Sequence, residues 1–315
     1  MRILWLATDR SSRVARIFDP LREEVSKMVQ VDSILKKLPM VAGQYIKAVK
    51  ENRLKESPMI NVKKANEYDL IMVDAPFAFI NERWENIKTK KACLFEDQHG
   101  FNPQISKMFM NKGFDYFFTR YNNILSRHQH LGKSNVIWLP HSIDDTVIKD
   151  YGEKKKIDAL MVGMLQQNTY PVRNYVNQQL NGAKWYRRVE RPRETLEKTK
   201  KWPVDEDYAR LINSSWITFS CLSKFQYPVL KFFEIPGCKS VLASDYNNQL
   251  KRLGFVPGKN MIKIERNTNN FKSFIKNQIK DKNKMQDISN KGYELVHNKH
   301  TVKQRAEEFL NYIED

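Results

Sequence analysis

The stretch that decides the fold is Tyr227–Asp245, which reads YPVLKFFEIPGCKSVLASD. Pro228 suits the first turn of a helix, because the N–H that proline lacks has no partner there. Pro236 and Gly237 predict where that helix ends. The apolar run Ser240–Ala243 then predicts a strand. A helix followed by a short, continuously apolar strand is typical of a parallel sheet covered on both faces.

The pattern extends outward through the second half of the chain. Ile157–Val162 (IDALMV) predicts a strand, Gly163 a turn, and a helix is expected from about Pro171. A later strand is predicted at Trp216–Ser220 (WITFS). The last ~50 residues are expected to be helical. Within them, Thr301 and Gln304 form a capping box, which predicts the start of the final helix. One apolar face follows it, made of Val302, Ala306, Phe309, Leu310 and Ile313.

The first half of the chain shows the same alternation. Apolar runs predict strands at Arg2–Ala7, Tyr68–Val73, Lys91–Phe95, Phe114–Thr119 and Val136–Leu139. Helices are expected at Asp19–Leu38 and Val41–Lys55. A charged stretch after Pro140 reads as a linker. The sequence therefore predicts an α/β protein of two Rossmann-like doubly wound domains, residues 1–145 and 146–315, facing each other across a cleft.

Composition narrows the possible partners. The 315-residue chain carries a net charge of +18, of which +6 falls in residues 1–150 and +12 in residues 151–315. Such an excess favours polyanions such as nucleic acid or wall polymers, although a solvated basic surface need bind nothing. Cys93, Cys221 and Cys238 lie far apart, which indicates buried thiols rather than disulfides. With no signal peptide and no membrane span in the sequence, we expect a cytoplasmic protein, in the host cytoplasm if it is viral.

Several chemistries are not predicted. The sequence has no P-loop and no GxGxxG turn. Asp205-Glu206-Asp207 precedes an apolar helix, so its charge suits a helix N-terminus better than a metal site. His128 and His130 face different sides of a helical stretch, and the Cys and His residues lack zinc spacing. No metal ion and no obligatory cofactor are expected.

Lys231 and Glu234 are the most informative pair of ionisable residues. They are three positions apart, so they share a face of the predicted helix. A lysine near a helix start suits a bound phosphate, and a carboxylate one turn later can accept hydrogen bonds from ribose hydroxyls. The same spacing also fits a surface Lys–Glu pair on an ordinary amphipathic helix.

The segment around this pair resembles a motif of the CgeB-like glycosyltransferases, R-x-F-E-x-x-x-x-G-x-x-L-x-x-D, with Lys231 in place of the arginine. The match continues through Phe233, Glu234 and Asp245, and Lys251–Glu265 and His300–Ala306 resemble two further blocks of the family. The resemblance implies a GT-B fold and a nucleotide-sugar co-substrate, with a UDP-sugar favoured. It implies donor-binding roles for four residues: Gly163, Arg173, Lys231 and Glu234.

The first half more weakly resembles the T-even phage DNA β-glucosyltransferases, on Tyr68–Phe79 (YDLIMVDAPFAF) and Lys90–Gly100 (KKACLFEDQHG). That resemblance implies that Asp97 is the general base and that DNA is the acceptor. Asp97 follows a buried strand beside Glu96 and His99, where clustered ionisable groups can tune a pKa. Alternatively, Glu96 or Asp97 caps the next segment. His99 is a lesser candidate, as the base or as a contact to the donor sugar.

The basic stretch Lys184–Lys201 contains Arg187, Arg188 and Arg191, which we predict to bind a polyanionic acceptor; it could equally be solvated. Three functions stay open. The first is sugar transfer to hydroxymethylated bases of phage DNA. The second is transfer to a cell-surface, wall or spore glycan. The third is a non-catalytic protein on the same scaffold that binds nucleic acid or a sugar nucleotide.

Overall fold

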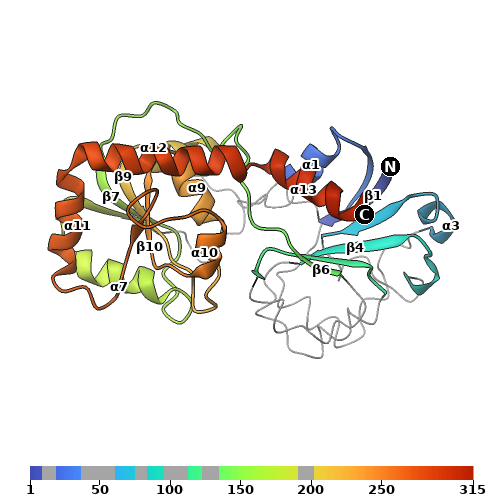
Figure 1. Cartoon of the computed structure of the whole chain (residues 1–315), viewed down its shortest axis with the longest axis horizontal. Helices are drawn as coiled ribbons and strands as arrows, with labels where there is room; N and C mark the ends of the chain where they lie inside the picture. Colours follow the sequence, from blue (N-terminus) through green and yellow to red (C-terminus); the bar gives the residue numbers. More distant parts are fainter. Residues whose placement is uncertain are drawn as a thin grey trace. The chain divides into compact units, whose positions relative to one another are not determined.

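The computed structural model describes residues 1–8, 19–36, 61–74, 84–95, 113–122, 135–190 and 202–314. The chain divides into two compact units (Figure 1). The first comprises Met1–Ser11, Ala15–Pro140 and Arg305–Asp315, and the second comprises Ser12–Val14 and His141–Gln304. The expected domains, 1–145 and 146–315, differ from these units chiefly at the C-terminus, where residues 305–315 belong to the first unit.

The first unit is built on a six-stranded parallel sheet with the strand order β2-β1-β3-β4-β5-β6. Short helical segments accompany it: α1 (Asp19–Val25), α3 (Val62–Ala65) and a 3-10 turn at Trp84–Asn86. The five strands predicted from apolar runs are confirmed to within about two residues. The strands are β1 (Arg2–Thr8), β2 (Gln30–Lys36), β3 (Leu70–Val73), β4 (Lys90–Phe95), β5 (Tyr116–Thr119) and β6 (Asn135–Trp138).

The predicted helix Asp19–Leu38 is wrong in its second half. Helix α1 ends at Val25, and Gln30–Lys36 is the edge strand β2, which pairs in parallel with β1 from Arg2↔Gln30 to Thr8↔Lys36. Pairing with β2 satisfies backbone groups on one side of β1 that a helix would leave unpaired. The other predicted helix, Val41–Lys55, lies outside the described residues.

Helix α13 (Val302–Glu314) carries the predicted C-terminal apolar face, and all five of its residues are buried. The capping box is confirmed, because the Thr301 backbone N–H donates to Gln304 Oε1 at 2.8 Å and the Gln304 N–H donates to Thr301 Oγ1 at 3.5 Å. Within the first unit, the Phe309 ring packs 5.7 Å from Trp5 and 4.9 Å from Phe118. The end of the chain thus completes the core around the first strand.

The second unit contains a five-stranded sheet with the order β11-β10-β9-β7-β8, again entirely parallel. The predicted strands near residues 157, 216 and 240 are confirmed as β7, β9 and β10. The basic stretch that begins at Lys184 starts with an edge strand, β8. The strands are β7 (Ile157–Val162), β8 (Tyr186–Val189), β9 (Ser215–Phe219), β10 (Val241–Ser244) and β11 (Ile262–Lys263).

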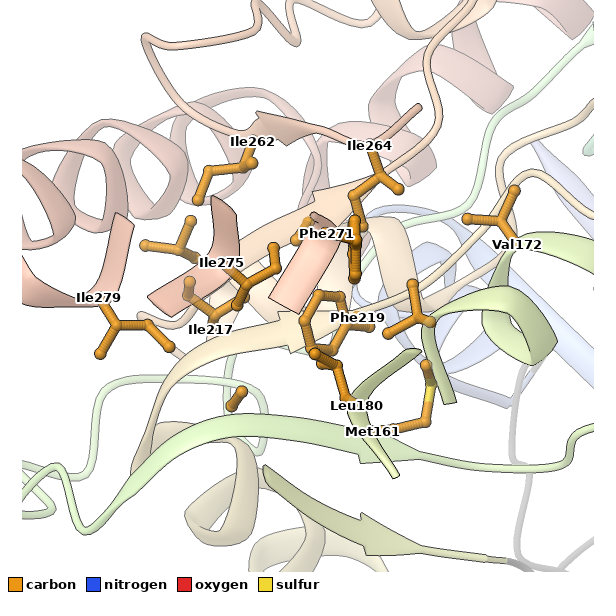
Figure 2. Packing of buried hydrophobic residues seen from close by; sticks show 14 of the residues in the cluster. Met161, Val172, Leu180, Ile217, Phe219, Ile262, Ile264, Phe271, Ile275 and Ile279 are labelled. Carbon is orange, nitrogen blue, oxygen red and sulfur yellow. The ribbon is translucent and has the colours of Figure 1, made fainter. Parts of the chain in front are cut away.

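Helices cover both faces of this sheet, as the buried central strands β7, β9 and β10 require. One face is built from Met161, Phe219, Phe271 and Ile275 and their neighbours on α7, α11 and α12 (Figure 2). Leu160 and Leu242 point to the opposite face, since side chains alternate along a strand, and are equally buried. The helices are α7 (Pro171–Leu180), α8 (Asp205–Asn213), α9 (Lys231–Gly237), α10 (Asn248–Arg252), α11 (Phe271–Lys280) and α12 (Lys282–Lys299).

The predicted linker is anchored to the second unit. The Ile143 N–H donates to the carbonyl of His300 at 2.9 Å, and the Val302 N–H donates to the carbonyl of Ile143 at 2.8 Å. Ile143 and Ile148 also pack against Gly237, where a β-carbon would come within 2.8 Å of Ile148. The close approach explains why a glycine, rather than a larger residue, ends α9.

Candidate functional site

A glycine and two polar residues directly follow three neighbouring strands of the second sheet. Gly163 comes directly after β7, Ser220 after β9 and Asp245 after β10. All the strands are parallel, so these positions share the carboxyl edge of the sheet. That edge is where open α/β sheets bind ligands. Two helices, α7 and α9, bring the remaining side chains to it.

Gly163 lies against two cationic side chains. A β-carbon at this position would be 3.0 Å from Lys231 Cε and 3.8 Å from both Lys231 Nζ and Arg173 Nη1. Its φ of +112° is also a conformation that residues with a β-carbon rarely adopt. The structure therefore brings together three predicted donor-binding residues, one from the turn after β7, one from α7 and one from α9.

Arg173 is a buried cation, with 3% of the residue exposed. Its Nη2 donates to Ser220 Oγ at 3.3 Å, and its guanidinium lies 4.1 Å from the centre of the Tyr170 ring. Among the described residues, its Nε has no hydrogen-bond partner and its charge has no salt-bridge partner. Burying a charge without such partners is costly, so the arrangement favours a bound anion.

Tyr208, on α8, links Lys231 to Glu234. Lys231 Nζ donates to the Tyr208 hydroxyl at 2.9 Å, and that hydroxyl donates to Glu234 Oε2 at 2.8 Å. The direct Lys231 Nζ to Glu234 Oε2 distance is 3.9 Å. Burial of the ring, and then the charge of Glu234, raise the pKa of Tyr208 well above its ordinary value, so it remains a donor.

Asp245 holds the loop after β9 to the end of β10. Its Oδ1 accepts from the Leu222 N–H at 2.9 Å and from Ser244 Oγ at 3.0 Å. Burial raises the pKa of the Asp245 carboxyl, while these hydrogen bonds and the positive charge of Arg173 act in the opposite direction. In the same loop Ser223 and Gln226 have φ values of 61° and 59°. Backbone conformations of this kind cost free energy and cluster at functional sites.

The other predicted site residues lie elsewhere. Arg187 and Arg188 are exposed on the edge strand β8, and Arg188 is paired with Glu190. Asp97, His99 and Arg191 lie outside the described residues. Sequence reasoning missed Tyr208 and Ser220. The sequence places Tyr208 only in the apolar helix that follows the acidic run 205–207, and no spacing rule connects that helix with α9.

Among the residues that the structure describes, no three His, Cys, Asp or Glu side chains form a group that could hold a metal ion. Asp205, Glu206 and Asp207 lie in the first turn of α8, as predicted from the sequence. None of the described helices has the length and apolar character needed to cross a membrane.

Residues 166–311 match the model of a protein family described as glycosyl transferase-like, which includes every residue of the site except Gly163. No curated protein sequence matches the chain significantly. Among solved structures, HepE of Anabaena in complex with UDP and glucose aligns over 100% of this chain and 99% of its own, with a TM-score of 0.63 and 11% identity.

Sucrose-phosphate synthase of Thermosynechococcus elongatus aligns equally well, with a TM-score of 0.63, 10% identity and coverage of 100% and 98%. The chain has the GT-B fold. A protein of Listeria monocytogenes described as a UDP-N-acetylglucosamine 2-epimerase also matches, with a TM-score of 0.58, 13% identity and coverage of 99% and 95%. The predicted fold class is confirmed, whereas the finer CgeB-like and phage resemblances stay predictions.

Proposed function

We propose that this chain is a glycosyltransferase that takes a sugar from a nucleotide-sugar donor held at the carboxyl edge of the second sheet. The observation that carries the proposal is that Gly163 lies beside both Lys231 and the guanidinium of Arg173. That guanidinium is buried, and its Nε has no hydrogen-bond partner among the described residues. A diphosphate would place negative charge beside the buried Arg173 guanidinium and an acceptor oxygen within reach of its Nε.

Each residue of the site then has a chemical role. Arg173 and Lys231 stabilise the negative charge that develops on the departing nucleoside diphosphate, in place of a metal ion. Gly163 leaves room for the diphosphate beside both cations, and Glu234 accepts hydrogen bonds from the ribose hydroxyls. UDP-sugars are the first donors to test, because the similar structure of HepE holds UDP and glucose.

The acceptor side of the proposal rests on the sequence. Asp97, two residues after the end of β4, serves as the general base that activates the acceptor hydroxyl, with His99 as the second candidate. The lead acceptor is DNA carrying hydroxymethylated bases, on the grounds of the N-terminal resemblance and the +18 charge. Exposed Arg187 and Arg188, together with Arg191, would meet its phosphates. A cell-surface, wall or spore glycan is the alternative acceptor.

The deciding experiment is a thermal-shift screen against UDP-, GDP-, ADP- and CDP-sugars, followed by transfer assays with radiolabelled donor. A ligand that binds only the folded state raises the melting temperature, by an amount that depends on its concentration relative to Kd. We expect stabilisation by a UDP-sugar and incorporation of label into hydroxymethylated DNA. Label that enters a glycan instead moves the acceptor to the alternative class.

Two further outcomes would overturn the proposal. Conversion of the donor to its epimer, without transfer, would assign the site to the reaction named for the Listeria protein. No stabilisation by any of the four donors at millimolar concentration would indicate a scaffold that has lost nucleotide-sugar binding. The salt dependence of transfer distinguishes the two classes of acceptor. Binding to a polyphosphate such as DNA weakens steeply as the salt concentration rises, whereas binding to a neutral glycan does not.

A further inference from the structure

Tyr208 lies between two predicted donor-binding side chains, Lys231 and Glu234, and its hydroxyl hydrogen-bonds to both. The Lys231 ammonium also lies 5.0 Å from the centre of the Tyr208 ring. The residue is 9% exposed, and it sits on α8, whereas Lys231 and Glu234 both belong to α9. The hydroxyl is 2.9 Å from Lys231 Nζ and 2.8 Å from Glu234 Oε2. It therefore ties the helix that carries both donor-binding side chains to a neighbouring helix.

The direction of these hydrogen bonds follows from the groups themselves. An ammonium group has no lone pair, so Lys231 must be the donor to Tyr208. The single proton of the phenol is then directed at the Glu234 carboxylate. Both bonds involve a charged partner and are stronger than bonds between neutral groups. The hydroxyl thus holds the cation and the carboxylate in fixed positions while keeping them 3.9 Å apart.

We propose that Tyr208 is a positioning residue for nucleotide recognition, and that it orients Glu234 so that Oε1 faces the ribose hydroxyls while Lys231 faces the diphosphate. The inference rests on the proposed function of the site. Burial, and then the charge of Glu234, raise the pKa of Tyr208 well above its ordinary value, which favours the protonated phenol that donates to Glu234.

The positioning role makes a specific prediction about ligand discrimination. Glu234 can favour UDP over 2′-deoxy-UDP and 3′-deoxy-UDP only if its carboxylate is correctly oriented. Without the Tyr208 hydroxyl between them, Glu234 can turn toward Lys231 and form a closer ion pair than the present 3.9 Å contact. The variant Tyr208→Phe should therefore bind UDP about ten-fold more weakly, the factor expected for loss of a hydrogen bond to a charged group. It should also lose most of the preference for the ribose hydroxyls.

The experiment measures Kd for UDP and the two deoxy analogues by calorimetry, in the full-length wild-type protein and in Tyr208→Phe. The matched control is Tyr151→Phe, which removes a hydroxyl that donates to the Val147 carbonyl at 2.9 Å in the segment before β7. The control should keep the wild-type Kd values and discrimination. In Glu234→Gln, the further change Tyr208→Phe should cost less than it does in the wild type, since the two residues act together.

The possible results separate the two proposals. Wild-type protein that does not bind UDP would refute the proposed function. Wild-type binding with unchanged discrimination in folded Tyr208→Phe would refute only the role of Tyr208. If Tyr208→Phe does not fold, the test uses the single variants Lys231→Met and Glu234→Gln and the double variant that combines them, with UDP affinity measured in each. Non-additive losses in UDP affinity are expected of two side chains that share one hydroxyl, and strictly additive losses would overturn the proposal.

Discussion

The backbone of Gly163 lies directly against the side chain of Lys231. A β-carbon on Gly163 would come within 3.0 Å of Lys231 Cε, and the φ of +112° would be strained for any residue that has one. The turn after β7 and the start of α9 are thus fitted to each other across the edge of the sheet.

The first prediction concerns Gly163→Ala. The added methyl group must displace the Lys231 stem or strain the turn, at a cost of about 1–3 kcal/mol. We expect UDP to bind at least about ten-fold more weakly, as measured by calorimetry. Gly182→Ala is the control, because Gly182 also has a positive φ, +73°, but nothing lies within 4 Å of its β-carbon position. Equal losses of UDP affinity in both variants would contradict a specific contact with Lys231.

The second prediction concerns Arg173→Met. Removing a buried charge that lacks a salt-bridge partner among the described residues should leave the melting temperature of the ligand-free protein unchanged or higher. Affinity for UDP should nevertheless fall at least about ten-fold, the cost of a lost charged hydrogen bond. Melting temperatures measured with and without UDP check both the stability of the ligand-free variant and its loss of UDP binding. An unstable variant that still binds UDP would show that Arg173 serves the fold instead.

Arg210→Met is the control for this variant. Arg210 lies on the same unit but is partly exposed, and it pairs with Glu153 and Glu206. Exposed pairs of this kind contribute little to stability because they are solvated and screened. The stabilisation of this control by UDP should match that of the wild type.

The third prediction concerns Asp97→Asn. Loss of the general base should reduce kcat by a factor of about 10²–10⁴, while the affinity for the donor is preserved, since Asp97 is assigned to the acceptor side. Transfer assays and calorimetry on the same preparation separate the two effects. The neighbouring Glu96→Gln variant should retain most of its activity. If the two variants are equally active, the assignment of the base to Asp97 is refuted.

The fourth prediction concerns the dependence of stability on pH. Burial lowers the pKa of Lys155 to about 8, although its Nζ donates to the carbonyls of Asn213 and Lys239 at 2.6 Å each. In the unfolded chain the pKa is 10.5. Between these values the unfolded state binds more protons, so the Lys155 contribution to stability rises with pH, by about 2 kcal/mol from pH 7 to pH 9.5.

Urea denaturation of wild type and Lys155→Met at both pH values tests this directly. The unfolding free energy of the wild type, minus that of Lys155→Met, should be larger at pH 9.5 than at pH 7. The exposed neighbour provides a control, since Lys154→Met should follow the pH dependence of the wild type. A difference between wild type and Lys155→Met that does not change with pH would exclude Lys155 as the titrating group.

The fifth prediction concerns the C-terminal helix. Phe309 is fully buried against Trp5 and Phe118 of the first unit, so Phe309→Ala should cost about 3–5 kcal/mol of unfolding free energy. Tyr312 on the same helix is 41% exposed, and Tyr312→Ala should cost much less. Hydrogen exchange locates the effect. We expect lost protection in β1 and β5, whereas losses confined to the second unit would contradict the placement of residues 305–315.

The local signals in the sequence predict much of the architecture. Short apolar runs such as Tyr68–Val73 and Ile157–Val162, alternating with amphipathic stretches, favour buried parallel strands, and the structure has strands there. The capping box at Thr301 and the end of the helix at Gly237 likewise depend on residues only a few positions away in the sequence. The resemblance to a glycosyltransferase motif predicts donor-binding roles for Gly163, Arg173, Lys231 and Glu234. The structure brings the first three of these residues together.

Other features depend on partners that are distant in the sequence. Gln30–Lys36 has spacing that suits a helix as well as a strand, and pairing with β1 decides in favour of the strand. The apolar face of α13 is visible in the sequence, but only packing shows that Trp5 and Phe118 cover Phe309. Tyr208 is an ordinary helical residue until α9 places an ammonium and a carboxylate on either side of its hydroxyl. Propensity and burial are encoded locally, so the sequence alone determined the buried central strands and the C-terminal helix, but not the edge strands β2, β8 and β11. Hydrogen bonds between side chains on different elements depend on three-dimensional distances, so only the tertiary structure decided how the site is assembled.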